Sequence, residues 1–383
     1  MKKLFLSFLC LCMLASSVIA CSATEPTVRQ TETTAQPEPT TFIDPEDCMH
    51  DRHDPETLRC LACNAVVDHY YRNGSCTKCG KETEFLWEVI RRDTALMDIL
   101  QSGGCEQKGT VERMTYETFA YNIHALTGEE RMIEKEAYVY LPYGYDATKP
   151  YNVLILQHGS GDTAGYWFAQ GAYNAEDKTT YHYTGNYTKE LLDYLIGTGK
   201  AAQCIVVTPT FYNDADNKTQ ENGVLQPLFG HEVVEYLLPA VIERYSTYAS
   251  TLDEVIENRE HFAYIGLSRG SRVSFDSILT YCLPYFAYVG SFSSPATDTD
   301  GLIEAINGEY KDYEILYWFC GVGDQDFGSN RYELIHQTFD ALTYGVDRLE
   351  EGKNCAMVDV YDAAHTYECW LTCLCNALPK FFR

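Results

Sequence analysis

The chain has 383 residues, of which 45% are hydrophobic, and its 29 Lys and Arg against 55 Asp and Glu give a formal net charge of −26. This excess of negative charge argues against nucleic-acid binding, which needs clustered basic side chains that displace counterions from phosphates. The 30 Tyr, 17 Phe and 4 Trp are too many for a disordered chain, and the long apolar run is confined to the N-terminus, which argues against several membrane spans.

The first twenty residues have the pattern of an export signal. Lys2 and Lys3 precede an apolar stretch over residues 4–19, and small residues lead up to Cys21. A cysteine at this place resembles a bacterial lipobox, in which the cysteine is diacylated; a plain signal peptide with a chance cysteine is the alternative. Residues 21–45 are rich in Thr, Pro, Glu and Gln, which is typical of a solvated tether. We therefore expect an exported protein, lipid-anchored through Cys21 at the outer face of a bacterial membrane.

Two C-x2-C pairs lie in the next segment, residues 46–81. They are Cys60 with Cys63 and Cys76 with Cys79, and the Asn-Gly pair at 73–74 suits a hairpin turn before the second. Four thiolates at such spacing predict a zinc-ribbon-like module with a structural zinc ion; a pair of disulfides is the alternative in an exported chain. The segment has no basic excess, so we expect a spacer or a site for a protein partner, and no cofactor for catalysis.

Residues 82–109 are expected to be a charged connector with a helix over 84–100. Beyond it, apolar and β-branched runs predict strands at 110–121, 134–140, 151–157, 202–208, 261–267, 286–292, 314–319 and 356–361. Helical spacing predicts helices at 189–197, 230–245, 270–281 and 331–344, with a kink or a helix start near Pro239. The alternation predicts an α/β domain over 110–383, with a mostly parallel sheet and helices on both faces. The eight cysteines beyond residue 100 match no ligand spacing and are expected to be small buried hydrophobic side chains.

A G-x-S-x-G pattern joins a predicted strand to a predicted helix. It spans Gly266 to Gly270, with Ser268 at its centre. In this context the two glycines allow a tight turn that exposes the serine at the carboxyl edge of the sheet, beside the positive end of the helix. Ser268 is therefore predicted to be a nucleophile rather than a helix cap.

A nucleophilic serine needs a base and an orienting carboxylate, which follow it in the order serine, acid, histidine in this kind of fold. His365 lies in a loop after the last predicted strand, whereas His336 falls within a predicted helix and is expected on its face. Asp324 is the first acid after the strand at 314–319 and is our choice, with Asp326 as the rival. Asp362 is expected to cap a turn beside His365.

The oxyanion formed on carbonyl attack needs two backbone N–H donors. Arg269, which follows the nucleophile, should provide one, and the loop after the strand at 151–157 should provide the other, through Ser160. His158 in that loop is expected to be structural. Trp167 and Phe211 follow neighbouring strands and are candidates for a substrate wall. The polar insertion at 212–223 is expected to be either a mobile rim or an inert loop.

Five ordered motifs over roughly residues 110–383 resemble the feruloyl and acetylxylan esterases, in the esterase D-like branch of the α/β-hydrolases. They are Tyr-Leu-Pro-Tyr-Gly-Tyr at 140–145, Leu-Ile-Leu-Gln-His-Gly at 154–159, the turn at 266–270, Cys-Gly-Val-Gly-Asp at 320–324, and the histidine at 365 with the tryptophan at 370. The resemblance implies an α/β-hydrolase fold, Ser268, Asp324 and His365 as a catalytic triad, and Ser160 and Arg269 as oxyanion donors. The family usually has Met-Gly-Gly after the nucleophile, whereas this chain has Arg-Gly-Ser.

These features predict a serine esterase that removes feruloyl or acetyl groups from plant polysaccharide, acting on a polysaccharide or small-molecule ester. Two alternatives remain. One is a siderophore esterase or an acyltransferase on the same fold. The other is a non-catalytic, lipid-anchored binding module whose zinc-ribbon-like segment docks a partner. The ordered serine, acid and histidine argue against the second alternative.

Overall fold

The structure is a computed structural model that describes residues 71–72, 75–76, 84–91, 93–169, 186–327 and 329–383. The chain divides into two units, Met1–Val67 and Asp68–Arg383, and all described residues belong to the second. The predicted signal, the tether and the greater part of the cysteine-rich module therefore lie outside the described residues. Two short strands, β1 (Tyr71–Arg72) and β2 (Ser75–Cys76), pair antiparallel on either side of positions 73 and 74.

An eight-stranded sheet organises the remainder, in the order β10-β9-β8-β7-β5-β6-β4-β3. The six strands from β10 to β6 are parallel to their neighbours, while β4 pairs antiparallel with β6 and with β3. The bounds are β3 Thr110–Phe119, β4 Met132–Leu141, β5 Asn152–Gln157, β6 Cys204–Thr208, β7 Phe262–Leu267, β8 Tyr288–Phe292, β9 Tyr317–Gly323 and β10 Cys355–Val360. All eight predicted strands of this domain are confirmed, and β9 runs four residues beyond its predicted end.

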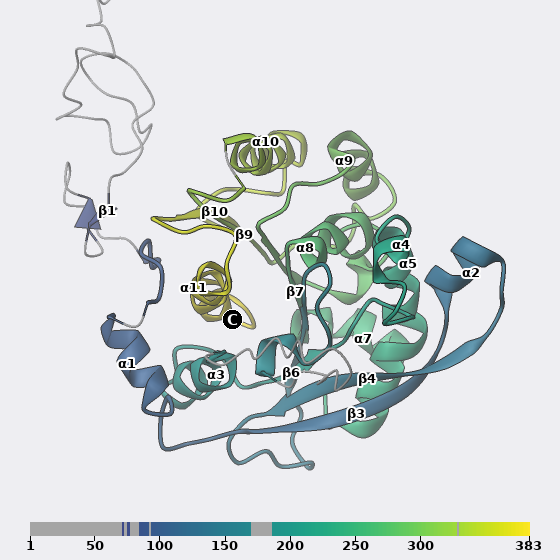
Figure 1. The fold of residues 1–383 in the computed structure, drawn as a ribbon, viewed down its shortest axis with the longest axis horizontal. Coiled ribbons are helices and arrows are strands. Elements are labelled where there is room, and N and C mark those ends of the chain that lie inside the picture. Colours follow the sequence, from purple (N-terminus) through teal and green to yellow (C-terminus); the bar gives the residue numbers. More distant parts are fainter. Residues whose placement is uncertain (1–70, 73–74, 77–83, 92, 170–185, 328) are drawn as a thin grey trace, which may run out of the picture. The chain divides into compact units, whose positions relative to one another are not determined.

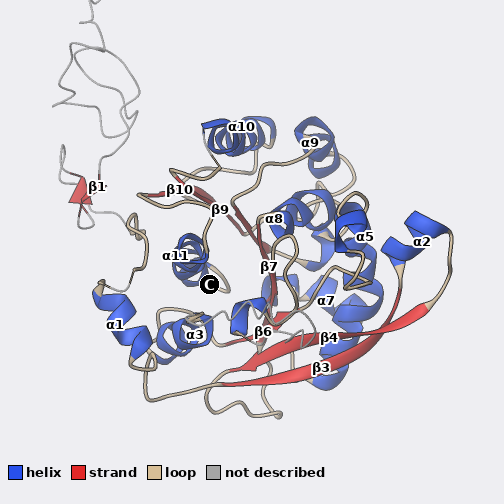
Figure 2. Cartoon of the chain, viewed as in Figure 1, coloured by secondary structure: helices blue, strands red, loops and turns tan. Residues whose placement is uncertain are grey.

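The central strands are buried on both sides because helices cover both faces of the sheet (Figures 1 and 2). One face packs against α1, α3 and α11, and the other against α5, α6, α8, α9 and α10. The helices are α1 Ala95–Gln101, α2 Tyr121–Thr127, α3 Thr188–Gly197, α4 Lys218–Glu221, α5 Leu225–Glu232, α6 Leu238–Arg244, α7 Leu252–Glu257, α8 Arg269–Val273, α9 Thr299–Asn307, α10 Ser329–Gly345 and α11 Tyr367–Ala377. A π-helical turn, Val233–Leu237, joins α5 to α6, and Pro239 lies in the first turn of α6, near a helix start as predicted.

The predicted helix over 84–100 is wrong in its first half. The backbone around Leu86 is extended and bonds to Asn376 of α11: its N–H donates to Asn376 Oδ1 (2.6 Å), and its carbonyl accepts from Asn376 Nδ2 (3.1 Å). The Ile90 N–H donates to Thr372 Oγ1 on the same helix (2.9 Å). Since these tertiary bonds replace helical ones, α1 begins only at Ala95. Val89 and Ile90 are buried with α11, so part of the predicted connector belongs to the core of this domain.

Candidate active site

The turn between β7 and α8 has the tight geometry that the G-x-S-x-G pattern predicts. Ser268 has φ 50° and ψ −111°, a strained conformation for a residue with a side chain. A Cβ on Gly266 would collide with the backbone of Gly270, and one on Gly270 would lie 2.6 Å from the carbonyl oxygen of His158. The close approach of three backbone segments therefore requires glycine at both positions, and it presents the half-buried Ser268 at the carboxyl end of β7.

His365 reaches Ser268 from the loop that follows β10. The His365 Nε2 atom lies 3.0 Å from the Ser268 Oγ atom, a hydrogen-bond distance. The two residues are 97 positions apart in sequence, and both are only partly buried, so the pair can be reached from solvent. The predicted pairing of this serine with this histidine is confirmed in geometry.

The carboxylate that contacts His365 belongs to Asp326 and not to Asp324, which corrects the sequence-based choice. The Asp326 Oδ1 and Oδ2 atoms lie 2.9 and 3.0 Å from His365 Nδ1, and the Asp326 side chain is fully buried. Asp324 is exposed, and its Oδ1 atom accepts a hydrogen bond from the Ala363 N–H (3.1 Å). The turn after β9 therefore directs Asp324 away from the imidazole of His365 and places Asp326 next to its Nδ1 atom.

The other acidic and imidazole side chains near this loop have partners of their own. Asp362 forms an ion pair with Arg91 (2.7 Å) and accepts a hydrogen bond from Gln325 (2.9 Å). His336 lies in α10 and pairs with Asp359 of β10 (2.8 Å), which confirms that it is a helix-face residue away from Ser268. Within the described part of the chain, His365 is thus the imidazole that faces the nucleophile.

The loop after β5 packs directly against the nucleophile. A Cβ on Gly159 would lie 3.4 Å from the Ser268 Cβ atom. The His158 ring is buried, with Nδ1 2.7 Å from the Gly159 carbonyl oxygen and Nε2 2.9 Å from Thr210 Oγ1, which confirms its structural role. Burial lowers the pKa of His158 to about 3. The ring is therefore neutral near pH 7, donating from Nδ1 and accepting at Nε2, and it holds the loop in place.

Ser160 and Arg269, the two predicted oxyanion donors, are joined by a side-chain hydrogen bond. The Arg269 Nε atom donates to Ser160 Oγ (2.7 Å), and Arg269 Nη1 donates to the carbonyl of Asn222 (2.9 Å). As the first residue of α8, Arg269 has a backbone N–H with no helical carbonyl to bind. Among the described residues, no hydrogen bond occupies the amide of Ser160 or that of Arg269. Both amides are thus available beside Ser268.

The insertion at 212–223 clamps this loop. The Tyr212 hydroxyl accepts from the Gly161 N–H (2.9 Å) and donates to Asn222 Oδ1 (2.7 Å). Lys218 donates to the carbonyls of Gly161 (3.0 Å) and Asp162 (2.9 Å). The insertion thus contributes directly to the shape of the site, which contradicts the inert-loop alternative; its mobility stays a prediction.

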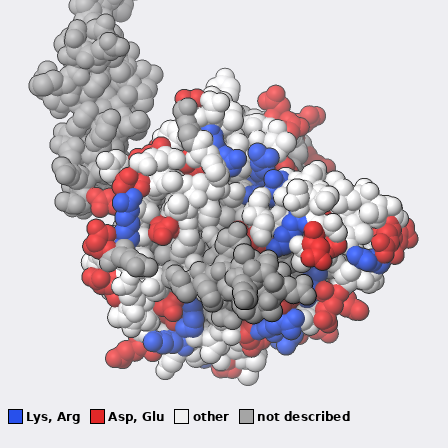
Figure 3. Space-filling view, in the orientation of Figure 1, with Lys and Arg blue, Asp and Glu red and all other residues white. Residues whose placement is uncertain are grey.

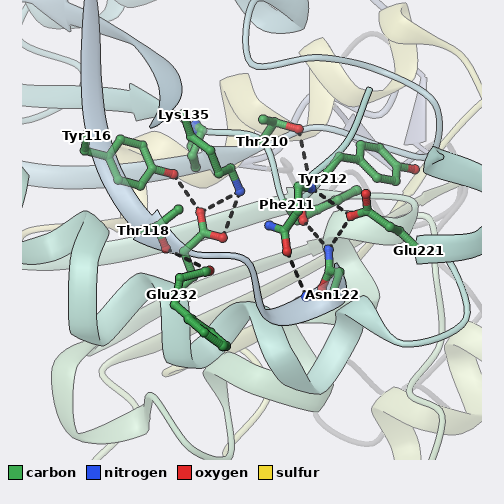
Figure 4. Close-up of polar contacts among 12 residues, drawn as sticks. Tyr116, Thr118, Asn122, Lys135, Thr210, Phe211, Tyr212, Glu221 and Glu232 are labelled. Atoms are coloured by element: carbon green, nitrogen blue, oxygen red, sulfur yellow. Dashed lines mark hydrogen bonds and ion pairs between the residues drawn. The ribbon is translucent and has the colours of Figure 1, made fainter. Parts of the chain in front are cut away.

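A buried polar network around Glu221 binds the backbone of the insertion and links it to α2 (Figure 4). Glu221 is fully buried, and its carboxylate accepts from Asn122 Nδ2 (2.5 Å), the Asn213 N–H (2.7 Å) and the Asp214 N–H (2.7 Å). The same figure shows a second buried cluster, in which Glu232 binds Lys135 Nζ (2.6 and 2.8 Å) and the Tyr116 hydroxyl (2.7 Å).

Trp167 and Phe211 do not form a substrate wall. Trp167 is fully buried and packs against Tyr367, and Phe211 is 1% exposed and packs against His158 and Phe229. Both side chains belong to the buried hydrophobic clusters of the domain. This prediction is therefore wrong.

Phe327 is an aromatic residue at the site that sequence reasoning missed. The residue is 64% exposed, and its ring lies 4.1 Å from the His365 ring, centre to centre. The signal available in the sequence was its position next to Asp326, the rival acid. A cavity of about 490 Å³ is lined in part by the loop that carries His365. Its lining includes Met97, Tyr187, Ala364, Thr366 and Tyr367.

The predicted zinc and lipid sites remain predictions. Cys21, Cys60, Cys63 and Cys79 lie outside the described residues, as does the side chain of Cys76 in β2. The described residues contain no group of three His, Cys, Asp or Glu side chains arranged to hold a metal ion.

The eight later cysteines are free thiols, and seven of them are buried, as predicted. No helix in the described part of the chain combines the length and the apolar character needed to cross a membrane.

Comparison with known proteins places the fold in the α/β-hydrolase class. No family model matches the chain. Endo-1,4-beta-xylanase Y of Acetivibrio thermocellus is 31% identical over 212 residues, which are 53% of this chain and 16% of that protein. The solved structure of a protein named FAE superposes with a TM-score of 0.58 at 23% identity, covering 78% of this chain and 97% of the other. A mutant feruloyl esterase module from Clostridium thermocellum, bound to sinapinate, gives a TM-score of 0.57 at 23% identity, over 78% and 95% of the two chains.

The eight-stranded sheet, its covering helices and these superpositions define an α/β-hydrolase fold. The parallel strands end at one edge of the sheet, and the loops after β7, β9 and β10 carry Ser268, Asp326 and His365 there. The hydrogen bonds from the Asp326 carboxylate through the imidazole to the serine hydroxyl form the acid–base–nucleophile arrangement that activates a serine.

Proposed function

We propose that this protein is a serine hydrolase of carboxylic esters that acts through an acyl-enzyme. The observation that carries this proposal is the contact of His365 with Ser268 Oγ at 3.0 Å on one side and with the Asp326 carboxylate at 2.9 Å on the other. This arrangement argues against a non-catalytic binding module. The backbone strain at Ser268 lowers the stability of the fold, and binding alone would not require a strained serine in contact with an imidazole.

In this mechanism, Ser268 Oγ attacks the ester carbonyl carbon while His365 Nε2 takes its proton. Asp326 stabilises the imidazolium and holds the tautomer in which Nδ1 carries hydrogen. The amides of Ser160 and Arg269 donate to the oxyanion of the tetrahedral intermediate. The imidazolium then passes the proton to the departing alcohol oxygen and an acyl-serine forms. Water, activated by the same imidazole, releases the acid and restores the serine.

We further propose that the substrates are feruloyl or acetyl esters of plant polysaccharide. Two findings support this substrate class: the partial similarity to a xylanase, and the likeness of fold to a feruloyl esterase module. The exposed ring of Phe327 beside His365 offers a surface on which an aromatic or sugar ring can stack. It takes the place of Trp167 and Phe211 as the candidate substrate contact.

For the N-terminal part we propose a lipid anchor at Cys21 and a structural zinc ion held by Cys60, Cys63, Cys76 and Cys79. The residue pattern supports both proposals. Metabolic labelling with a fatty acid, compared with Cys21→Ser, tests the anchor. Metal analysis of the purified protein, compared with Cys60→Ser, tests the zinc ion.

The direct test of activity is hydrolysis of 4-nitrophenyl acetate by the purified protein and by Ser268→Ala. We expect steady turnover by the wild type and a loss of at least about 10³-fold in the variant. Equal inertness of the two proteins would favour a binding module. Methyl ferulate, acetylated xylan and a triscatechol ester, offered side by side, test the substrate class against that of a siderophore esterase.

A further inference from the structure

Three arginines converge on the edge of the sheet that carries Ser268. Arg269 and Arg272 lie on α8, directly after the nucleophile and about one turn further on, and Arg331 lies near the start of α10. Arg272 Nε donates to Ser294 Oγ (3.3 Å), and Arg331 Nη1 approaches the Ser293 carbonyl oxygen (3.5 Å). Because Ser293 and Ser294 are consecutive residues just after β8, the two guanidinium groups meet at one loop beside the nucleophile.

None of these three guanidinium groups forms an ion pair with a described carboxylate. Among the described residues, no carboxylate oxygen lies within the 4.0 Å ion-pair distance of any of them. The oxygens that they contact belong to serine hydroxyls and to backbone carbonyls. In contrast, Arg91 and Arg113 each pair with a carboxylate at 2.7 Å. In a chain with 55 Asp and Glu against 29 Lys and Arg, these three arginines thus have no direct ion pair, although Asp326 lies near enough to act on Arg331 and Asp276 near enough to be acted on by Arg272.

Placing these charges together is unfavourable in the protein alone. Burial, and the charges of Arg272 and Arg331, lower the pKa of Arg269, and burial and Arg272 lower that of Arg331, although nearby Asp326 acts in the opposite direction on Arg331. Figure 3 shows several groups of positive side chains in the upper and right-hand parts of this face, with negative side chains beside some of them and around the periphery. An anion that binds between the arginines would relieve this repulsion.

The position of Arg331 indicates which half of the ester would carry the anion. Its guanidinium lies 4.7 Å from the centre of the Phe327 ring, and that ring packs on His365. In the proposed mechanism the imidazole passes its proton to the departing alcohol, so the alcohol half of the substrate lies on the His365 side. The acyl carbonyl oxygen, by contrast, points toward the amides of Ser160 and Arg269.

We infer that the site prefers esters whose alcohol half carries an anionic group, held by Arg272 and Arg331. The carboxylate of an acidic sugar is the chemical class that fits a polysaccharide substrate. This inference rests on the proposed esterase function. It also accounts for the arginine that follows the nucleophile, because Arg269 adds to the same positive field while its Nε and Nη1 atoms brace Ser160 and Asn222.

The test uses two probes that differ in charge: 3-acetoxybenzoate, whose alcohol half carries a carboxylate, and its neutral methyl ester. The methyl ester has the better leaving group, so intrinsic reactivity works against the expected result. We expect the wild type to favour the anionic probe in kcat/KM by about fivefold or more at low salt. High salt, Arg272→Gln and Arg331→Gln should each lower that ratio severalfold, and Arg331→Lys should lower it less.

Arg244→Gln, at an exposed position at the end of α6, is the matched control and should leave the ratio unchanged. Thermal unfolding of each variant shows whether it is folded. If the wild type hydrolyses both probes without preferring the anion, or if the ratio is the same in the arginine variants, the inference is overturned while the esterase function stands. If it hydrolyses no ester at all, the proposed function fails and the inference fails with it.

Discussion

Exchange of the two candidate acids for asparagine separates the structure-based triad from the sequence-based one. In the wild type, both oxygens of the buried Asp326 carboxylate lie within 3.0 Å of His365 Nδ1. Asp326→Asn keeps the size of the side chain but removes its charge, and its amide group can favour the tautomer with hydrogen on Nε2, which cannot accept the Ser268 proton. The same change in the triad of a serine protease lowers kcat about 10⁴-fold, and we expect a loss of about 10³- to 10⁴-fold here, equivalent to about 4–5.5 kcal/mol.

Asp324→Asn is the matched variant, two residues away in the same turn. Asp324 is exposed and accepts one hydrogen bond from the Ala363 N–H, which an asparagine oxygen can also accept. We therefore expect its kcat to stay within about threefold of the wild type. Initial rates with 4-nitrophenyl acetate at saturating concentration measure both effects, and circular dichroism monitors folding. A large loss in folded Asp324→Asn, with near-normal activity in Asp326→Asn, would refute the assignment of Asp326 as the triad acid.

Two further predictions concern stability. Burial lowers the pKa of His158 to about 3 in the folded state. Below about pH 6.5 the unfolded chain therefore binds a proton at His158 that the folded chain does not bind. The free energy of unfolding consequently falls as the pH falls. In urea unfolding, the wild type should lose about 2 kcal/mol more than His158→Gln between pH 7 and pH 5; equal losses would contradict the reasoning. Glu232→Gln should cost about 3–5 kcal/mol, because it leaves the buried Lys135 ammonium without its counter-charge. In the double variant with Lys135→Met, most of the lost free energy of unfolding should return. A double variant that is no more stable than Glu232→Gln alone would contradict the coupling between Lys135 and Glu232.

Local sequence carried enough information for the elements of the fold and for the nucleophile. Strand runs such as 151–157 and 261–267 are mostly apolar without alternation, which is a property of single segments that are buried on both faces. The turn around Ser268 depends on glycines two positions before and after it, so its geometry is also local. His365 could be chosen because few histidines follow the nucleophile and the chain order restricts the candidates further.

The errors have a common origin in contacts between distant segments. The helix predicted over 84–100 fails where Asn376 and Thr372 of α11 take over the backbone hydrogen bonds of the segment. Trp167 and Phe211 follow the expected strands, but packing with distant residues such as Tyr367 and Phe229 buries them. In each case, the pattern within the segment was compatible with the prediction, and a partner far along the chain decided the outcome.

The sequence by itself determined an α/β arrangement with a nucleophilic elbow, because hydrophobic periodicity and glycine placement act over a few residues. Only the tertiary structure decided between Asp324 and Asp326, since that choice depends on how the turn after β9 meets the loop after β10. It alone also brought Arg331 of α10 and Arg272 of α8 to the same loop after β8, because β7, β8 and β9 lie next to one another in the sheet. Side chains that act together from several loops are positioned by the packing of the whole sheet, and no short stretch of sequence records that packing.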